Sequence, residues 1–150
     1  MPIRPFRPDD IEPLMKILND TKVFRRDELE VARELMEIAA TQPEKRDYEL
    51  ATFVDETGEP QGYYCVGRTP MTDGTYDLYW IATRPTLHGK GAGSELLRHC
   101  EERVRRAGGR LIVAETSSKP SYERTRAFYV RKGYREQGRI SNYYARGDDL

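Results

Sequence analysis

The sequence predicts an α/β fold with a mixed, mostly antiparallel twisted sheet flanked by about four helices. Three observations predict it. Short runs rich in β-branched and aromatic residues alternate with segments whose apolar residues recur at helical spacing. The dipeptide Asp73-Gly74 is a hairpin signal, which implies antiparallel pairing of the strands around it. Farther on, the order strand, glycine-rich loop, helix, strand is typical of a parallel crossover.

Length and composition indicate one domain that spans residues 1–150, with 37% apolar and 33% charged residues. Lys plus Arg equals Asp plus Glu, at 25 each, so the charge balance gives no reason to expect nucleic acid or an acidic membrane as a partner. The two cysteines, Cys65 and Cys100, are far apart and are interpreted as buried thiols in a reducing compartment. With only two histidines, we expect no metal site.

The N-terminus has no apolar segment typical of a signal peptide, and no apolar run approaches the ~20 residues that span a bilayer. We therefore expect a soluble, cytoplasmic protein.

The first third of the chain predicts a short strand and two helices. The strand covers Ile3 to Arg7, and Asp9 or Asp10 is expected to cap the helix that follows. The second helix is expected to begin at Asp27, with Glu30 completing a capping box, and to end before Pro43. The apolar side of the first helix consists of Ile11, Leu14, Met15 and Leu18.

Three strands are predicted next, over Tyr48–Val54, Gln61–Gly67 and Thr75–Thr83. A third helix follows Gly93, and Gly108-Gly109 ends it. Its buried stripe consists of Leu96, Leu97, Cys100 and Val104.

The last third predicts a strand over Arg110–Ser117, a helix over Ser121–Lys132 and a strand over Tyr134–Ala145. The strand Arg110–Ser117 should lie parallel to Thr75–Thr83, because a helix connects the two. The sheet is therefore expected to be mixed, with this parallel pair at its centre.

Three alternating glycines, Gly89, Gly91 and Gly93, lie between a predicted strand and a predicted helix. Glycine lets the backbone approach a ligand, and a helix N-terminus offers unpaired N–H groups to an anion. A Walker loop is a poor match because Gly91, and not Ser or Thr, follows Lys90. A dinucleotide fingerprint is also a poor match, because Ser94 stands at its third glycine. The loop predicts a phosphate site, and a tight turn without ligand is the alternative.

The segment from Asp77 to Gly93 resembles the central motif of the GNAT superfamily of N-acetyltransferases, a strand followed by Pro-x-x and Gln/Arg-x-x-Gly-x-Gly/Ala. His88 stands where the family usually has Gln or Arg. The segment from Phe128 to Tyr134 is similar to the family's Phe-Tyr-x-x-x-Gly-Phe. The two motifs occur in the family's order. The resemblance implies the GNAT fold, with acetyl-CoA as acyl donor.

The resemblance also implies which residues hold acetyl-CoA. Backbone groups at the end of the strand would bind the pantetheine arm, and the glycine loop would bind the pyrophosphate. The implied residues are Ile81, Ala82, Thr83, His88, Gly89, Lys90, Gly91, Ala92, Gly93 and Ser94.

The implied reaction is direct attack of a primary amine on the thioester. Tyr129 stands at the family's tyrosine position and is the candidate acid for the leaving thiolate, with a core aromatic as the alternative. Asp77 is the candidate base, and strand alternation would place it on one face with Tyr79, Ile81 and Thr83. Glu115 is the other candidate base. Both carboxylates also fit structural salt bridges.

The acceptor is expected to be a small molecule or an amino-acid-like amine. A peptide amine (a protein N-terminus or lysine) and a non-catalytic acyl-CoA-binding module remain alternatives. Family members continue into a final strand where this chain ends, at Gly147-Asp148-Asp149-Leu150. We therefore expect that strand to be missing here or to come from another chain, which leaves a homodimer open.

Overall fold

Five strands form one sheet in the computed structural model, which describes residues 2–150. They lie side by side in the order β1-β2-β3-β4-β5. The first four pair antiparallel. The strands are β1 (Ile3–Pro5), β2 (Glu49–Val54), β3 (Pro60–Arg68), β4 (Thr75–Thr83) and β5 (Leu111–Ala114).

The fifth strand starts beside the start of β4. There the N–H groups of Arg110 and Leu111 both donate to the Gly74 carbonyl, at 2.7 and 3.2 Å. Both strands leave this point in the same direction, so β4 and β5 are the parallel pair. The predicted mixed α/β sheet is confirmed.

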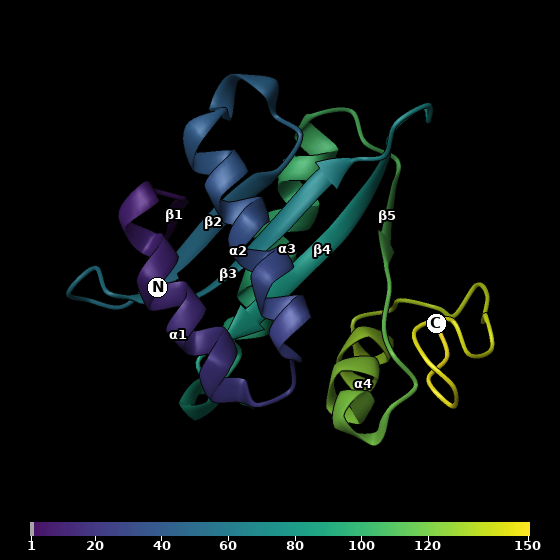
Figure 1. Cartoon of the computed structure of the whole chain (residues 1–150). Coiled ribbons are helices and arrows are strands. Elements are labelled where there is room, and N and C mark those ends of the chain that lie inside the picture. The colour runs from purple at the N-terminus through teal and green to yellow at the C-terminus, as the bar shows by residue number, and fades with distance from the viewer. Residues whose placement is uncertain (1) are drawn as a thin grey trace. The chain divides into compact units, whose positions relative to one another are not determined.

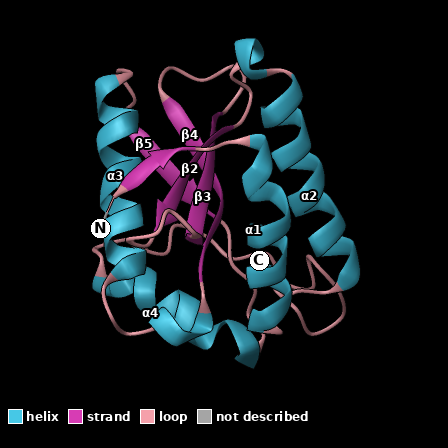
Figure 2. Cartoon of the chain, turned by 90° about the vertical axis from the view of Figure 1, so that its left-hand side faces the viewer, coloured by secondary structure: helices cyan, strands magenta, loops and turns pink. Residues whose placement is uncertain are grey.

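Four α-helices occur within residues 2–150, together with short 3-10 turns. Figure 2 shows α1 and α2 on one side of the strands and α3 on the other. None of the helices in the described part of the chain has the length and apolar content to cross a lipid bilayer. The helices are α1 (Ile11–Thr21), α2 (Arg26–Thr41), α3 (Ala92–Arg106) and α4 (Glu123–Arg131).

The core between α1, α2 and the sheet follows from the helical spacing of apolar residues. Leu14, Ile17 and Leu18 of α1 meet Tyr63 and Cys65 of β3, all of them buried. On the opposite face of the sheet, α3 buries its own stripe, as predicted. That stripe comprises Ala92, Leu96, Leu97, Cys100 and Val104.

Contacts divide the chain into two compact units, one that ends at Val113 and one from Ala114 to Leu150. The first unit contains α1 to α3 and strands β1 to β4 (Figure 1). The second contains α4 and the C-terminal segment.

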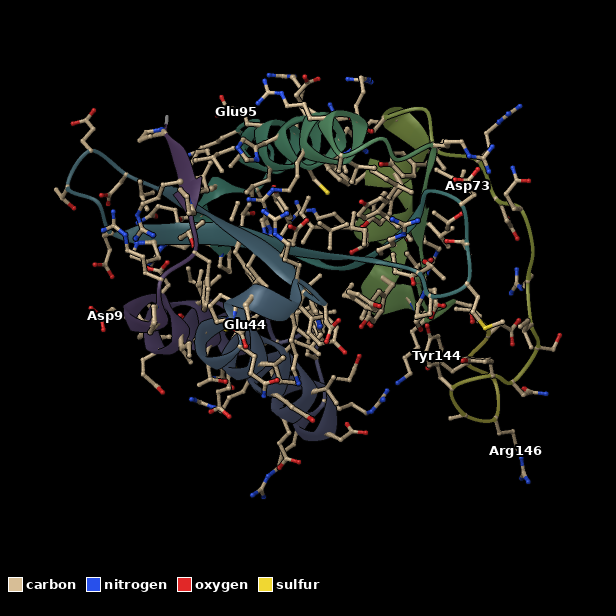
Figure 3. The ribbon with its side chains drawn as sticks, turned by 90° about the horizontal axis from the view of Figure 1, so that it is seen from above. Asp9, Glu44, Asp73, Glu95, Tyr144 and Arg146 are labelled. Atoms are coloured by element: carbon tan, nitrogen blue, oxygen red, sulfur yellow. The ribbon has the colours of Figure 1, made fainter. Side chains whose placement is uncertain are left out.

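Asp10 is the N-cap residue of α1, as predicted, whereas the cap predicted for the second helix was wrong. The second helix begins at Arg26, and its capping box joins Arg25 N–H to the Glu28 carboxylate at 3.0 Å, instead of using Asp27 and Glu30. Asp10 makes no side-chain cap for α1, because its carboxylate is buried and accepts from Arg4, Arg7 N–H and Thr52. Asp9 is exposed and points away from the fold (Figure 3).

The strand predicted over Tyr134–Ala145 is wrong. The segment forms turns that side chains hold in place. Asn142 has a left-handed φ of 57°, and its N–H donates to the Asp149 carboxylate at 2.8 Å. Ile140 and Leu150 exchange two backbone hydrogen bonds, at 2.7 and 2.9 Å, so the chain end folds back on this segment. The strand and helix predicted on either side of residue 118 are also shorter than expected, at Leu111–Ala114 and Glu123–Arg131.

Candidate active site

The glycine loop between β4 and α3 adopts a backbone that requires glycine. Gly89 and Gly91 have φ values of +79° and +88°, in the left-handed region that side chains with a Cβ rarely adopt. A Cβ at either residue would meet no atom within 4 Å. Both glycines therefore border open space.

The N–H groups in the first turn of α3 point toward the end of the glycine loop. The first N–H that donates within the helix is that of Glu95, which reaches the Gly91 carbonyl at 3.0 Å. Helix geometry leaves Ala92, Gly93 and Ser94 without an acceptor inside the helix. Lys90 is exposed next to them. Partial positive charge at the helix end and the Lys90 ammonium favour an anion here.

A β-bulge in β4 lies two residues before the predicted pantetheine-binding residues. Leu78 is paired with Val66, and Trp80 with Cys65, so Tyr79 is an extra residue with no counterpart on β3. Residues 81 to 83 then continue in regular register, with Thr83 opposite Gly62. Ile81 and Ala82 are half-buried, whereas Thr83 is buried.

The bulge corrects the predicted face of Asp77. Asp77 is opposite Gly67, which lies on the same face of β3 as Cys65. Because Tyr79 is inserted, Ile81 and Thr83 point to the other face, where α3 packs. Asp77 therefore does not share a face with Ile81 and Thr83. It lies on the side of α1 and α2, with Trp80 and Ala82, which pack against the core there.

The Asp77 side chain is half-buried and accepts a hydrogen bond from Thr69 Oγ1 at 2.7 Å. Thr69 itself pairs with the first residue of β4, through its N–H and the Thr75 carbonyl at 2.8 Å. The carboxylate is thus held at the hairpin end of β3 and β4.

The remaining predicted catalytic residues belong to the second unit. Glu115 is exposed and comes directly after β5. The Tyr129 ring is half-buried on α4, with the centroids of Phe128 and Tyr134 at 5.5 and 5.3 Å. The glycine loop follows the end of β4, whereas Asp77 lies in the same unit at the opposite, hairpin end of this strand. Tyr129 lies in an aromatic cluster of the other unit.

A polar cluster in the second unit was missed at the sequence level. Asp148 is 2% exposed, accepts a hydrogen bond from Ser117 Oγ, and lies 3.6 Å from Lys119 Nζ. Arg126 Nη1 donates to the carbonyls of Ser117 and Lys119, at 2.6 and 2.9 Å. The cluster ties α4 and the chain end to one turn. No motif signals it, because its members come together only in the fold.

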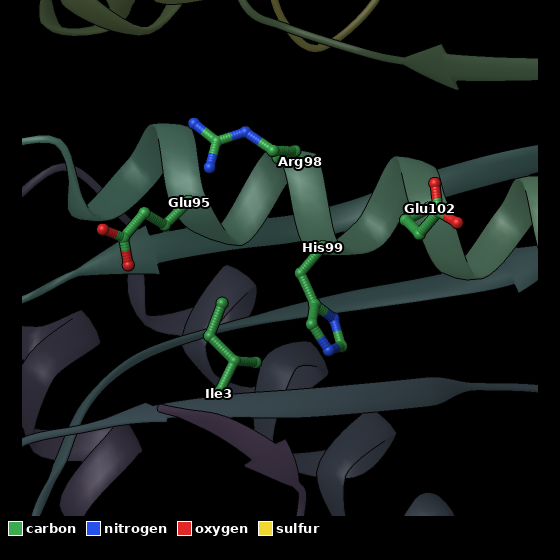
Figure 4. Close-up of a pocket in the computed structure, with 5 residues that line it drawn as sticks. All are labelled: Ile3, Glu95, Arg98, His99 and Glu102. Atoms are coloured by element: carbon green, nitrogen blue, oxygen red, sulfur yellow. The ribbon is translucent and has the colours of Figure 1, made fainter. Parts of the chain in front are cut away.

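The sequence also gave no indication of a pocket beside α3. This pocket has a volume of about 340 Å³ and is lined by Ile3, Glu95, Arg98, His99 and Glu102. The His99 ring points from α3 toward the strands (Figure 4). His99 Nδ1 lies 2.9 Å from the Tyr64 hydroxyl. Burial lowers the pKa of His99, and Arg103 and Arg106 lower it further. No group of three metal-ligating side chains gathers anywhere in residues 2–150.

Comparison with known proteins identifies the family and agrees with the observed sheet. A model of the acetyltransferase (GNAT) family matches residues 11–138. A Desulfovibrio desulfuricans protein assigned to the GNAT acetyltransferases has a similar solved structure, with 36% identity and a TM-score of 0.91. That match covers 99% of this chain and 93% of the other. Among curated proteins, no relative was found.

Two more distant structures share the fold. An aminoglycoside 6'-N-acetyltransferase in complex with coenzyme A is 19% identical, with a TM-score of 0.75 and coverage of 99% of this chain and 93% of that one. The ribosomal-protein-S18-alanine N-acetyltransferase from Escherichia coli is 16% identical, with a TM-score of 0.75 and coverage of 99% and 88%.

Proposed function

The chain belongs to the GNAT family of acetyltransferases, and on that premise we propose that it transfers an acetyl group from acetyl-CoA to a primary amine. The acceptor in this proposal is a small molecule or an amino-acid-like amine. We further propose a cytoplasmic setting, in which the buried thiols of Cys65 and Cys100 stay reduced.

The loop ahead of α3 carries the proposal. Open space borders Gly89 and Gly91, and the first-turn N–H groups of α3 lie next to it. A doubly charged pyrophosphate fits this arrangement, because the peptide dipoles and the Lys90 ammonium are both complementary to its charge. The backbone of Ile81, Ala82 and Thr83 would hold the pantetheine arm.

When bound, acetyl-CoA supplies an activated acyl group as its thioester. Transfer breaks the C–S bond and forms a C–N bond, so one proton must leave the nitrogen and one must reach the sulfur. Asp77 is the proposed acceptor of the first proton, directly or through water, with Glu115 as the alternative. The Tyr129 hydroxyl is the proposed donor of the second.

The test is a titration of acetyl-CoA, desulfo-CoA and ATP against the melting temperature of the protein. Both CoA species should raise it, by the equivalent of about 2.7 kcal/mol at a hundredfold excess over the dissociation constant. ATP should not raise it. Thiol release from acetyl-CoA in the presence of amines then measures transfer. No shift with either CoA species would refute the proposal.

A further inference from the structure

Tyr79 is unusual among the residues of β4. It is 41% exposed, whereas the other eight residues of the strand are buried or half-buried. Burial of an aromatic ring is one of the larger single contributions to the stability of a fold. An exposed ring on an interior strand is therefore a position where the surface is kept open.

The Tyr79 ring lies over a glycine of the neighbouring strand. A Cβ at Gly67 would come within 3.0 Å of Tyr79 Cε2 and within 2.3 Å of the Asp47 carbonyl oxygen. Glycine at this residue makes room for the ring to lie against β3. Beyond Gly67, the ring meets Tyr48 edge to face, with centroids 5.4 Å apart.

A second aromatic pair continues this surface. Trp80 packs edge to face against Phe24 of the α1–α2 connection, with centroids 4.9 Å apart. Phe24, Tyr48 and Trp80 are backed by the core between α1, α2 and the sheet. Four rings from three separate segments thus lie on the same face of the sheet, and we call them the aromatic platform: Phe24, Tyr48, Tyr79 and Trp80.

A carboxylate borders the aromatic platform. Asp77 is opposite Gly67, the glycine on which the Tyr79 ring lies, and on the same face of the sheet. Thr69 Oγ1 donates to Asp77 Oδ2 and leaves Oδ1 for another donor. Aromatic faces and a carboxylate both attract a cation, and the rings offer an apolar surface as well.

We propose that this surface binds the acceptor and that the acceptor is a primary amine carried on a flat apolar group, such as an arylalkylamine. The inference rests on the proposed acetyl transfer. An alkylamine has a pKa of about 10.4 and arrives as an ammonium at neutral pH. The ammonium pairs with Asp77, the apolar group stacks on Tyr79 and Tyr48, and Asp77 then lies where the amine must lose its proton.

The charge and the rings together decide this class of acceptor. A polyhydroxylated amine would leave its hydroxyl groups without partners against the four rings, and unpaired polar groups cost free energy on burial. The more distant structural relative that acetylates aminoglycosides therefore differs from this chain in its expected acceptor.

The test compares 2-phenylethylamine with ethanolamine and with an aminoglycoside, kanamycin. We expect kcat/KM for 2-phenylethylamine to exceed that for each of the other two amines by tenfold or more. A ratio of about this order is what one cation–π contact and ring stacking contribute together. Binding has its own readout. Trp80 is the only tryptophan in the chain, so its fluorescence should change saturably with 2-phenylethylamine, without acetyl-CoA, and not with ethanolamine.

Variants of Tyr79 separate aromatic recognition from apolar area. Tyr79→Leu should raise KM for 2-phenylethylamine about tenfold with kcat within about twofold, and Tyr79→Phe should restore the low KM, because only Phe keeps the ring face. Val31→Ala, at a residue of α2 that is 49% exposed and outside the core cluster that backs the platform, is the control and should change neither constant.

The outcomes separate this inference from the proposed function. If acetyl-CoA raises the melting temperature and some amine is acetylated, but 2-phenylethylamine has no advantage and Trp80 does not respond, the inference is wrong and acetyl transfer stands. If acetyl-CoA does not bind, the proposed function fails, and the role of this surface as an acceptor site fails with it.

Discussion

The Arg4 guanidinium and the Asp10 carboxylate form a two-pronged ion pair, with both N···O distances at 2.8 Å. The same carboxylate accepts from Arg7 N–H and from Thr52 Oγ1, each at 2.9 Å. This one side chain therefore joins β1, the turn before α1, and β2. Asp10 is 2% exposed, so its charge is stabilised by these donors in place of water.

Asp10→Ala should destabilise the fold by about 3 kcal/mol, because it leaves the partly buried Arg4 without its counter-charge. Asp9→Ala is the matched control, since Asp9 is the exposed neighbour, and it should change stability by less than about 0.5 kcal/mol. Urea unfolding measures both variants. Equal effects of the two substitutions would contradict the role given to the ion pair.

The pH dependence of the same group gives a second prediction. Burial alone would raise the pKa of Asp10, but the hydrogen bonds from Arg4, Arg7 N–H and Thr52 bring it below its ordinary value. Its stabilisation is therefore present above the unfolded pKa of about 3.9 and is lost as the pH falls through the lower folded pKa. The difference in melting temperature between wild type and Asp10→Ala should shrink below pH about 4.

His99 predicts a separate loss of stability at mildly acidic pH. Burial, with Arg103 and Arg106 next, lowers its pKa below the ordinary value of about 6.5. Between the folded and unfolded pKa values the unfolded chain binds more protons, so stability falls as the pH drops. When melting curves are compared at pH about 7.5 and about 5.5, the melting temperature of His99→Gln should fall by less than that of wild type. An equal loss in the two proteins would contradict the role given to His99.

The cofactor loop can be tested by two glycine substitutions with the same backbone. Gly91 and Gly58 have φ values of +88° and +87°, and a Cβ at either would meet nothing within 4 Å. Each change to Ala should cost about 1 kcal/mol of stability through the left-handed backbone. Only Gly91→Ala adds a methyl group beside α3 and should weaken acetyl-CoA binding, about tenfold by calorimetry. Equal affinities in the two variants would remove the loop from the binding site.

The bounds predicted for the strand Thr75–Thr83 are those of β4. They were predictable because Asp73-Gly74 precedes its apolar and aromatic run and Pro85 follows it. The position of the bulge inside it was not predictable from the strand alone. It depends on where Cys65 and Val66 pair across the sheet, and alternation within one strand carries no such information. That is why Asp77 was placed on the wrong face.

The C-terminal segment shows the same limit of local reasoning. Tyr134 to Ala145 contains enough apolar and aromatic residues to predict a strand. Asp149 instead accepts from Asn142 N–H and pairs with Arg139 at 2.8 Å, and these bonds stabilise turns. The backbone of the glycine loop was predictable, because the left-handed conformation of Gly89 and Gly91 depends on consecutive residues.

Tyr129→Phe tests the proposed acid. The kcat for acetyl transfer should fall about a hundredfold, and acetyl-CoA affinity should change little, since a general acid acts in the transition state. Tyr134→Phe is the matched control, because this substitution also removes only a hydroxyl. The Tyr134 ring lies in the same cluster, with its centroid 5.3 Å from that of Tyr129. If both variants keep wild-type turnover, another group protonates the thiolate.

The Asp148 cluster gives the last prediction, and Figure 3 shows the C-terminal segment that it anchors, with the Arg146 side chain pointing outward. Asp148 is 2% exposed and accepts from Ser117 Oγ. Asp148→Ala should therefore destabilise this segment by about 1 to 3 kcal/mol. Amide exchange at Ile140 and Leu150, whose N–H groups bond to each other's carbonyls, should speed up in proportion.

A double-mutant cycle with Ser117→Ala decides whether the pair acts directly. If Ser117 and Asp148 stabilise the segment through each other, the double variant should cost about as much as Asp148→Ala alone, because the second substitution removes a partner that is already lost. The Lys119 ammonium, 3.6 Å from Asp148, does not change this expectation, since it is present in all four proteins. Additive losses would mean that the two side chains stabilise the chain end independently.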